Sequence, residues 1–280
     1  MESATSFRDP AGCCCLIGDR VLRWISADHA PAFEAFLATP TAQQFIAGRQ
    51  LVSVRKLPPA ERESLKGLAG LPDVFAATGN GEVFEHERVE FPSYPCEWPA
   101  EMLHAAGQLT LNLARTTLAD GHGLKDATPD NVLFRGTQPV FVDLLSFEKR
   151  ATGDPVWKPY AQFVRMFLLP LLVHQRWGLP LADLFVAHRN GLEPEAVYRL
   201  CGPLRRLFPP FLEWVSLPTW LSRRGEDHAA HRERRVDNPE KAGFILEMTL
   251  KRLERALEKV RPRRNATSTW SDYMDTHSYT

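Results

Sequence analysis

The proline-rich segment 91–99 constrains the fold more than any other part of this chain. It holds three prolines in nine residues, and because proline lacks a backbone N–H and fixes φ, such a run resists both a helix and a central strand. The sequence before the segment favours short strands, and the sequence after it has helical periodicity. We therefore expect residues 1–91 to form a small β-rich lobe with one principal helix, and residues 92–280 to form a larger helical lobe.

In the first lobe, alternating apolar residues and turn-forming pairs predict strands on either side of a helix. Gly18-Asp19 and Asn80-Gly81 are pairs that favour tight hairpin turns. Strands are expected at residues 13–17, 20–25, 51–57, 75–78 and 83–89. A helix is expected over residues 30–46, with a break at Pro40. The lobe is therefore expected to be a sheet of hairpins with one interrupted helix.

The second lobe is expected to be mainly helical. Apolar residues recur with a period of 3.6 from Met102 to Leu118 and predict a long helix. A short hairpin is expected around Gly136, because two β-rich runs flank that glycine. The expected order is the hairpin at 132–134 and 140–142, several helices over 157–221, a polar loop over 222–238, an amphipathic helix over 239–260, and a candidate linker over 262–280. The fold class is therefore α+β.

Composition and charge exclude several classes of protein. Lys plus Arg and Asp plus Glu both number 34, so no overall field attracts nucleic acid or an anionic membrane. The most apolar stretch, residues 166–173, is much shorter than the roughly 20 residues that cross a bilayer. The five cysteines, three of them consecutive at 13–15, lack the spacing of a disulfide framework or a metal site. The first ten residues also lack a secretory signal, so we expect a cytoplasmic location, no nucleic-acid partner and no membrane insertion.

Three polar residues around the short hairpin carry the chemical signal. Asp126 and Asn131 are separated by a loop that Pro129 stiffens, and Asp143 follows the second apolar run of the hairpin. The hairpin can return Asp143 beside Asn131, and a carboxylate facing an amide oxygen suits Mg²⁺, which takes few protein ligands together with phosphates and water. Asp126 would lie nearby as a group that orients or deprotonates a hydroxyl. The alternative is structural, because Asp and Asn also favour turns and caps.

The segment 126–131 resembles the catalytic loop of the protein-kinase-like superfamily, in particular its small-molecule phosphotransferases. In that loop an Asp precedes an Asn by five residues with a Pro between them, and Asp143 falls where the superfamily has its magnesium-binding Asp. The resemblance implies a bilobal kinase-like fold with a reduced β-rich N-lobe and a larger helical C-lobe. It also implies Mg²⁺ and ATP as cofactors, Asn131 and Asp143 as metal ligands, and Asp126 as the catalytic residue that acts on an acceptor hydroxyl.

Other site residues are carried over from the same resemblance. Lys125 fills a place often held by Arg and could contact a phosphate, or it could be a solvated partner of Asp126. Arg23 and Glu34 could correspond to the strand lysine and helix glutamate that pair in kinases, with an exposed Arg and a solvated Glu as the structural alternative. Glu85, His86 and Glu87 lie on the strand before the linker, where the resemblance implies that the backbone reads an adenine edge while the side chains point to solvent.

The chain also departs from the kinase pattern. Leu124 stands where the superfamily has a His, and Leu144-Leu145 follow Asp143 where a glycine is usual. No G-x-G-x-x-G motif occurs, so the lid over the nucleotide phosphates is expected to be short or absent.

A second resemblance concerns residues 123–148. This run is similar to the kinase-like N-terminal region of bacterial proteins labelled class I S-adenosylmethionine-dependent methyltransferases of nodulation-protein type. Residues 270–279 look like the segment that leads into the methyltransferase domain of those proteins. The 280 residues contain no strand, glycine-rich turn and helix of the kind that this cofactor needs, so methyl transfer by this chain alone is not expected.

Two hypotheses therefore remain open from the sequence. The first is a Mg·ATP-dependent phosphotransferase that acts on a hydroxyl of a small molecule. The second is a catalytically inactive, kinase-shaped module that binds a substrate or a partner for a methyltransferase.

Overall fold

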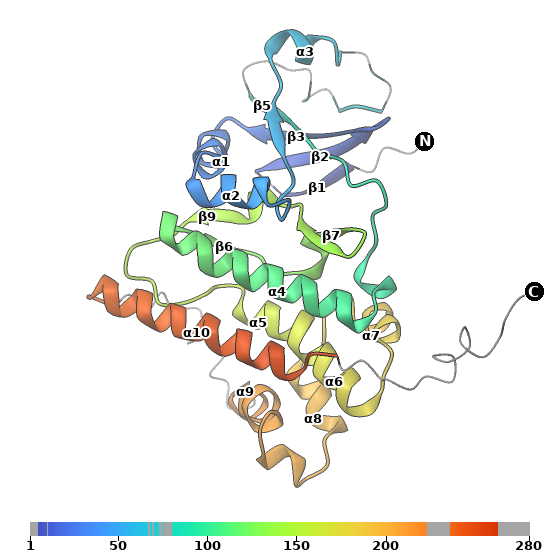
Figure 1. Ribbon diagram of the computed structural model, residues 1–280, viewed down its shortest axis with the longest axis vertical. Helices are drawn as coiled ribbons and strands as arrows, with labels where there is room; N and C mark the ends of the chain where they lie inside the picture. Colours follow the sequence, from blue (N-terminus) through green and yellow to red (C-terminus); the bar gives the residue numbers. More distant parts are fainter. Residues whose placement is uncertain are drawn as a thin grey trace, which may run out of the picture.

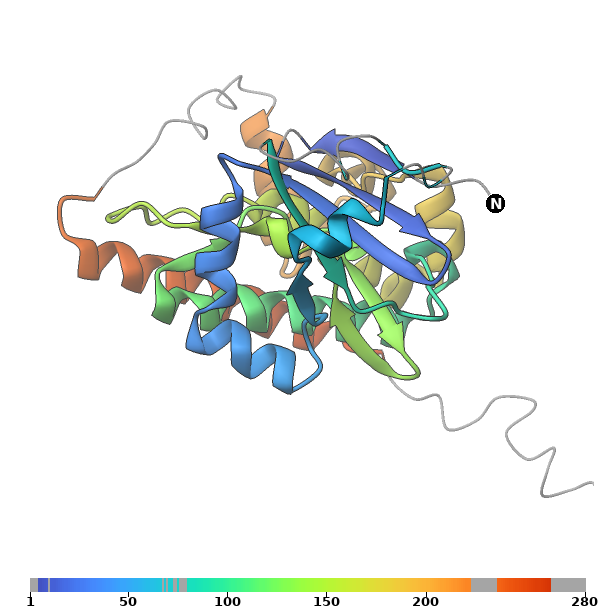
Figure 2. The same ribbon diagram turned by 90° about the horizontal axis from the view of Figure 1, so that it is seen from above.

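The computed structural model describes residues 5–9, 11–66, 68, 70–72, 75, 80–222 and 236–262 of the chain. It is a mixed α/β protein in which a β-sheet lies on a layer of helices (Figure 1). Seen from above, the sheet lies across the helical layer, with two helices along one side (Figure 2). Among the helices within these ranges, none has both the length and the apolar character needed to cross a membrane.

The sheet has five antiparallel strands in the order β1-β2-β3-β5-β4. The strands are β1 (Thr5–Asp9), β2 (Gly12–Ile17), β3 (Arg20–Ser26), β4 (Val54–Lys56) and β5 (Gly81–His86). The predicted hairpin around Gly18-Asp19 is confirmed, because β2 and β3 pair on either side of this turn. Gly18 has a φ of 56°, a left-handed conformation that glycine adopts without steric cost.

Of the hairpin predicted between residues 75–78 and 83–89, the second strand is present as β5, which pairs with β3 on one side and with β4 on the other. Residues 76–79 themselves lie outside the described part of the chain. The strand expected over 51–57 is also shorter than predicted, because Leu51 forms a parallel bridge to Phe141 of another sheet and only β4 joins the main one.

The helix predicted over 30–46 is confirmed, including its break. It forms α1 (Ala30–Leu37) and α2 (Pro40–Ala47), with Pro40 at the first position of the second helix. Proline suits this position because the N–H that it lacks would have no partner there. Thr39 caps α2, since its hydroxyl oxygen accepts a hydrogen bond from the Ala42 N–H at 3.2 Å.

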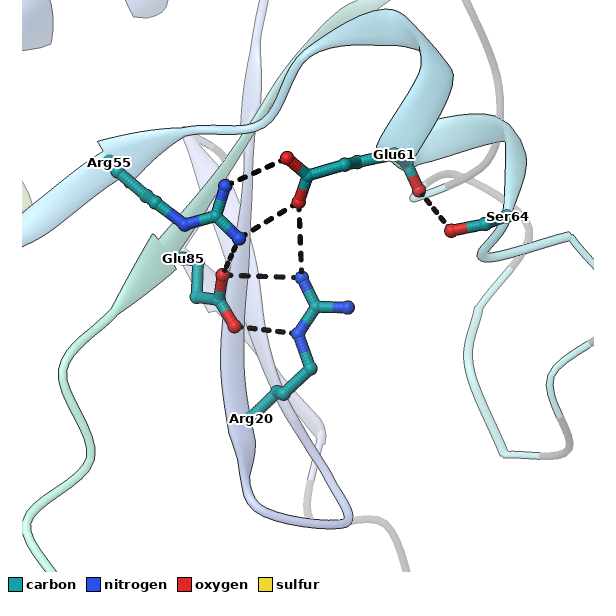
Figure 3. Close-up of polar contacts among 5 residues, drawn as sticks. All are labelled: Arg20, Arg55, Glu61, Ser64 and Glu85. Carbon is teal, nitrogen blue, oxygen red and sulfur yellow. Dashed lines mark hydrogen bonds and ion pairs between the residues drawn. The ribbon is translucent and has the colours of Figure 1, made fainter.

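An ion network fastens α3 (Pro59–Glu63) to the outer face of the sheet (Figure 3). Glu85 on β5 accepts hydrogen bonds from Arg20 on β3 and from Arg55 on β4. Arg55 also forms a bidentate pair with Glu61 on α3, with N···O distances of 3.0 and 2.8 Å. Four charges from three strands and one helix therefore neutralise one another on the outer face. The opposite, inner face of the sheet is the one that faces the helical layer.

The helical layer is built around α4 (Ala100–Thr116), which confirms the long helix predicted after the proline-rich segment. The amphipathic helix predicted over 239–260 is present as α10 (Pro239–Lys259), which packs along α4 (Figure 1). The side chain of Asn238 caps its first turn. The other α-helices among the described residues are α5 (Tyr160–Phe163), α6 (Leu169–Trp177), α7 (Leu181–Ala187), α8 (Pro194–Leu200) and α9 (Leu217–Ser222). Most of the loop expected over 222–238 and of the linker expected over 262–280 lies outside the described residues, which omit 223–235 and 263–280.

Two short β-ladders lie between the sheet and the helices. β6 (His122–Leu124) pairs with β9 (Phe147–Lys149), and β7 (Val132–Arg135) pairs with β8 (Gln138–Phe141), which is the hairpin predicted around Gly136. The Val52 N–H donates to the Phe141 carbonyl at 3.1 Å, and the Phe141 N–H donates to the Gln50 carbonyl at 2.9 Å. The chain just before β4 is thereby bonded to the end of β8.

One apolar cluster crosses this junction. From the sheet side it contains Ile25, Phe33 and Phe84, and from the hairpin side it contains Val140 and Leu144. The rings of Phe33 and Phe84 meet edge to face with centroids 4.8 Å apart. Because the same cluster buries residues of both layers, the position of the hairpin relative to the sheet is fixed by packing.

Gly81 allows β5 to approach β3 closely, and this predicts a large cost for a side chain at that position. A Cβ there would lie 2.3 Å from the Ile25 carbonyl oxygen and 2.8 Å from the Trp24 ring. We expect Gly81→Ala to destabilise the protein by about 1–3 kcal/mol or more through overpacking, measured by urea unfolding. The matched control is Gly243→Ala in α10, where a Cβ would meet nothing within 4 Å beyond its own helix backbone and where alanine should stabilise the helix by up to about 1 kcal/mol. Similar effects of the two substitutions would contradict this packing.

Candidate functional site

An ion pair between Arg23 and Asp143 joins the sheet to the hairpin. Arg23 is on β3, directly after Leu22, which packs against Leu57 and Val83 on the outer face of the sheet. The alternation of side chains along the strand therefore points Arg23 to the inner face. Asp143 comes two residues after the end of β8. The Arg23 Nη1 donates to Asp143 Oδ1 at 2.6 Å, and the side chains are 15% and 26% exposed. The pair is thus shielded but still reached by solvent.

Ser146 links Asp143 to Asn131. The Ser146 hydroxyl donates to Asp143 Oδ2 at 2.6 Å, and its oxygen accepts a hydrogen bond from Asn131 Nδ2 at 3.2 Å. The Val142 N–H also donates to the Asn131 carbonyl at 2.9 Å. The hairpin therefore returns Asp143 beside Asn131, as the sequence predicts. Asn131 ends a 3₁₀ turn that begins at Pro129, and this turn sets the direction of its side chain.

Lys125 and Asp126 lie in the loop between β6 and that turn. The Lys125 N–H donates to the Ser146 carbonyl at 2.8 Å, so the loop is attached to the same turn that carries Ser146. The Ala127 N–H donates to the side-chain oxygen of Gln162 on α5 at 2.7 Å, which ties the other side of the loop to the helical layer. Both Lys125 and Asp126 are half-buried, and the loop that carries them is held at two points.

The charges of the site stabilise one another. Burial disfavours the carboxylate of Asp143, but the charge of Arg23 and the hydrogen bonds from Ser146 and Arg23 outweigh it, so the pKa of Asp143 lies below its ordinary value. The charge of Lys125 acts in the same direction. Burial likewise disfavours the guanidinium of Arg23, yet the charge of Asp143 raises the pKa of Arg23 above its ordinary value. Asp143 is therefore an anion in the folded protein at neutral pH.

His86, at the end of β5, is a buried neutral side chain beside this ion pair. It is 6% exposed, and burial, helped by the charge of Arg23, lowers its pKa to about 3 against the opposing effect of Asp143. Its Nε2 has no hydrogen-bond partner, and neither does the Nε of Arg23. Two buried nitrogen atoms next to Asp143 therefore lack partners within the protein.

The expected pair of Arg23 with Glu34 is not formed. Arg23 pairs with Asp143, whereas Glu34 on α1 accepts a hydrogen bond from Lys56 on β4 at 2.8 Å. Sequence order alone does not show which strand places a positive charge next to α1. In the structure that charge is Lys56 of β4.

Glu87, just beyond β5, is held by a different set of contacts. Its N–H donates to the Ser53 carbonyl at 2.9 Å, and its carboxylate lies 2.9 Å from a guanidinium nitrogen of Arg135 on β7. The side chain of Glu87 thereby connects the end of β5 to the hairpin.

The sequence reasoning did not single out Ser146 or Gln162 as site residues, and it expected the side chain of His86 to point to solvent, whereas that side chain is buried. Ser146 could have been noticed as a hydroxyl three residues after Asp143, a spacing at which a turn brings the two side chains together. Gln162 lies 35 residues from the backbone N–H that it binds, and no local pattern indicates this contact. His86 was visible in the sequence, but the position of its side chain depends on the pairing of β5 with two strands.

The site can supply oxygen ligands to a small cation. No cluster of three or more His, Cys, Asp or Glu side chains suited to a metal occurs in the described ranges. Asn131 and Asp143 offer an amide oxygen and a carboxylate on either side of Ser146, and the amide nitrogen of Asn131 is already used as a donor to that serine. Two hard oxygen ligands fit Mg²⁺ when the remaining ligands are phosphates and water.

The fold and the site define a mixed α/β protein with a charged polar site between a sheet and a helical layer. No protein-family model matches the chain. The chain is similar to the nodulation protein NoeA of Rhizobium meliloti strain 1021, with 33% identity over 193 residues that cover 64% of this chain and 38% of that protein. The similarity agrees with the nodulation-protein resemblance of residues 123–148. The match covers well under half of the relative's length, and the relative's name states no activity.

The burial of His86 predicts that the protein loses stability in acid. The pKa of His86 is about 3 in the folded protein against 6.5 ordinarily, so the unfolded chain binds the additional proton and the free energy of unfolding falls as the pH drops below 6.5. At pH 5 this loss is on the order of 2 kcal/mol. The free energy of unfolding, measured with urea at pH 7 and at pH 5, should therefore fall less in His86→Phe than in the wild type, by about this amount. His188→Phe, at an exposed position, should behave as the wild type; an unchanged pH dependence in His86→Phe would refute the assignment.

Proposed function

We propose that this protein is a kinase-like phosphotransferase that binds Mg·ATP between the sheet and the helical layer and transfers a phosphoryl group to a hydroxyl of a small molecule. The observation that carries the proposal is the polar set Arg23, Asp143, Ser146 and Asn131, which is assembled from β3 and from both sides of the hairpin. A cytoplasmic location, where ATP is abundant, is part of the same proposal.

The architecture supports a kinase-like bilobal fold. A five-stranded antiparallel sheet has two helices inserted between its third and fourth strands, and the segment after β5 leads through the proline-rich residues to a long helix. This is the order of elements that the resemblance of residues 126–131 to the kinase catalytic loop implies. The loop, the hairpin and Asp143 then follow α4 in the expected sequence.

In this proposal, Asn131 and Asp143 hold Mg²⁺, which when bound neutralises charge on the phosphate oxygens. Arg23 contacts the phosphates, and Lys125 adds a second positive charge to the same region. Asp126 orients the acceptor hydroxyl and accepts its proton. The backbone next to Glu87 contacts the adenine, whereas Glu34 acts only indirectly, by fixing Lys56 on the inner face.

The ion pair has a consequence for the order of binding. A lone Mg²⁺ would have to approach Asp143 while Arg23, a cation, is already 2.6 Å from that carboxylate. The negatively charged triphosphate can replace Asp143 as the partner of the Arg23 guanidinium, while the metal replaces Arg23 as the partner of the Asp143 carboxylate. Metal and nucleotide should therefore bind together and not separately.

This predicts the response of the melting temperature to ligands. Mg·ATP at about 100 times its dissociation constant should add about 2.7 kcal/mol to the free energy of unfolding, whereas Mg²⁺ alone should have little effect. Asp143→Asn should lose most of the shift, and Asp126→Asn should keep the shift but lose phosphoryl transfer by about 100-fold or more. Asp183→Asn on the exposed surface of α7 is the control. A full shift in Asp143→Asn, or none in the wild type, would contradict the proposal.

A second candidate is a non-catalytic module that binds a methyltransferase. Two observations favour it: the chain matches only 38% of the length of NoeA, and both oxygens of Asp143 already have partners within the protein. In such a module the polar set would hold the two layers together and Asp126 would have no chemical role.

The second candidate is tested by co-expression with a methyltransferase domain of the nodulation-protein type. A module should form a complex of defined mass in size-exclusion chromatography with light scattering, and methyl transfer by the partner should be unchanged by Asp126→Asn. The absence of a complex, together with ATP turnover that Asp126→Asn abolishes, would reject this candidate and favour the phosphotransferase.

A further inference from the structure

The segment between α8 and α9 exposes several apolar side chains to solvent. Leu200, Leu204, Leu207 and Phe208 are all exposed, and Leu204 and Phe208 keep 75% and 63% of their surface accessible. We call residues 199–208 the tip, because this segment lies at the end of the helical layer farthest from the sheet (Figure 1). Single exposed apolar residues are ordinary on a protein surface, whereas several that gather on one projecting segment indicate a contact surface.

The tip is also basic. Residues 196–212 contain three arginines and no Asp or Glu. The guanidinium of Arg205 lies over the ring of Trp177, 5.8 Å from its centroid, and that of Arg206 lies over the ring of Tyr198 at 4.0 Å. Within the described residues these two guanidinium groups stack on aromatic rings and form no salt bridge. Their positive charge therefore remains available to an anion from outside the protein.

A cavity of about 1170 Å³ adjoins the tip. Arg205 lines it from the tip, and Arg176 and Lys259 line it from the ends of α6 and α10. The aromatic ring of Phe211 belongs to its apolar wall, and Glu101 is the one acidic residue in the described lining. Cations from three separate elements thus meet at one hollow with a net positive charge, which suits an anionic group.

An anionic lipid surface matches both the apolar and the basic character of the tip. Apolar side chains on a projecting segment can enter the boundary between headgroups and acyl chains, while neighbouring cations attract the lipid phosphates. A soluble anion would leave Leu204 and Phe208 in water, and a protein partner would need a hollow shaped to receive a projecting tip. The charge of the whole chain is balanced, so the attraction is local and sets the orientation of the protein on the membrane.

We propose that the tip docks on the surface of a membrane that contains anionic phospholipid. Leu204 and Phe208 enter the headgroup boundary, and the cavity beside them binds a lipid phosphate through Arg176 and Arg205. The contact is peripheral and requires no segment to cross the bilayer. Because the tip is at the end of the helical layer away from the sheet (Figure 1), the site around Asp143 stays open to soluble ligands in the docked protein.

The test is cosedimentation with vesicles of phosphatidylcholine, prepared with and without phosphatidylglycerol. The wild type should sediment with the anionic vesicles, stay in solution with the neutral ones, and be released by high salt. Arg176→Gln and Arg205→Gln should each lower the partition constant about fivefold, because each removes one positive charge from the membrane surface. Phe208→Ser should lower it about tenfold, because the ring no longer leaves water on binding.

Two variants away from the tip are the matched controls. Phe91→Ser removes a ring that is 84% exposed from the segment between β5 and α4, and Arg49→Gln removes an exposed cation just after α2. Neither should change the partition constant. Circular dichroism verifies that each variant is folded. If Arg205→Gln does not fold without its contact to Trp177, Arg199→Gln at an exposed position of the tip repeats the test of charge.

Three results would overturn the inference. The first is equal sedimentation with neutral and anionic vesicles, or sedimentation with neither, including the case in which the tip binds a protein instead. The second is an equal loss of binding in the tip variants and in the controls. The third is release of the wild type by inorganic phosphate together with unchanged binding by Phe208→Ser, which would make the cavity a site for soluble anions. No arm of the test involves Asp126 or Asp143, so its failure leaves the proposed phosphotransferase untouched.

Discussion

The position of the candidate site depends on the bonding of the β7–β8 hairpin to the underside of the sheet. Phe141 exchanges main-chain hydrogen bonds with the segment just before β4, and Val140 and Leu144 enter the apolar cluster under β3 and β5. Asp143 lies between these anchors, so its carboxylate has little freedom except to face Arg23. The ion pair is therefore a result of backbone pairing and apolar packing, and those two forces determine which chemistry can occur there.

The ion pair resolves a conflict between burial and charge. An isolated guanidinium or carboxylate at this depth would be costly, because desolvation opposes both charged forms. Together they stay ionised, and Ser146 and Asn131 satisfy much of the remaining hydrogen-bonding capacity. Any ligand at this site must preserve the balance. It has to offer Arg23 an anion and Asp143 a cation, as the metal–phosphate complex of the proposed function would.

The sequence predicts those features that arise from local physics. Prolines at 40 and 129, the turn at Gly18 and the helical period after Pro99 each set the backbone within a few residues, and the corresponding elements are confirmed. Contacts that depend on strand order could not be predicted in this way. β5 lies between β3 and β4, and it is Lys56 of β4, not Arg23, that pairs with Glu34. The return of Asp143 to Asn131 was predictable because a hairpin with a two-residue turn fixes it.

The two faces of the sheet differ in how completely their charges are compensated. On the outer face, Arg20, Arg55, Glu61 and Glu85 form mutual hydrogen bonds, and each charge has an opposite neighbour (Figure 3). On the inner face, Arg23 keeps an unpartnered Nε, and His86 keeps an unpartnered Nε2. Unmet hydrogen bonds lower stability, so a protein that gained nothing from them would be more stable with apolar side chains there. Trp24 Nε1, on the outer face of β3, and the Nε of Arg62 are unpartnered as well, so within the described residues the cost of unmet hydrogen bonds falls on both faces of the sheet.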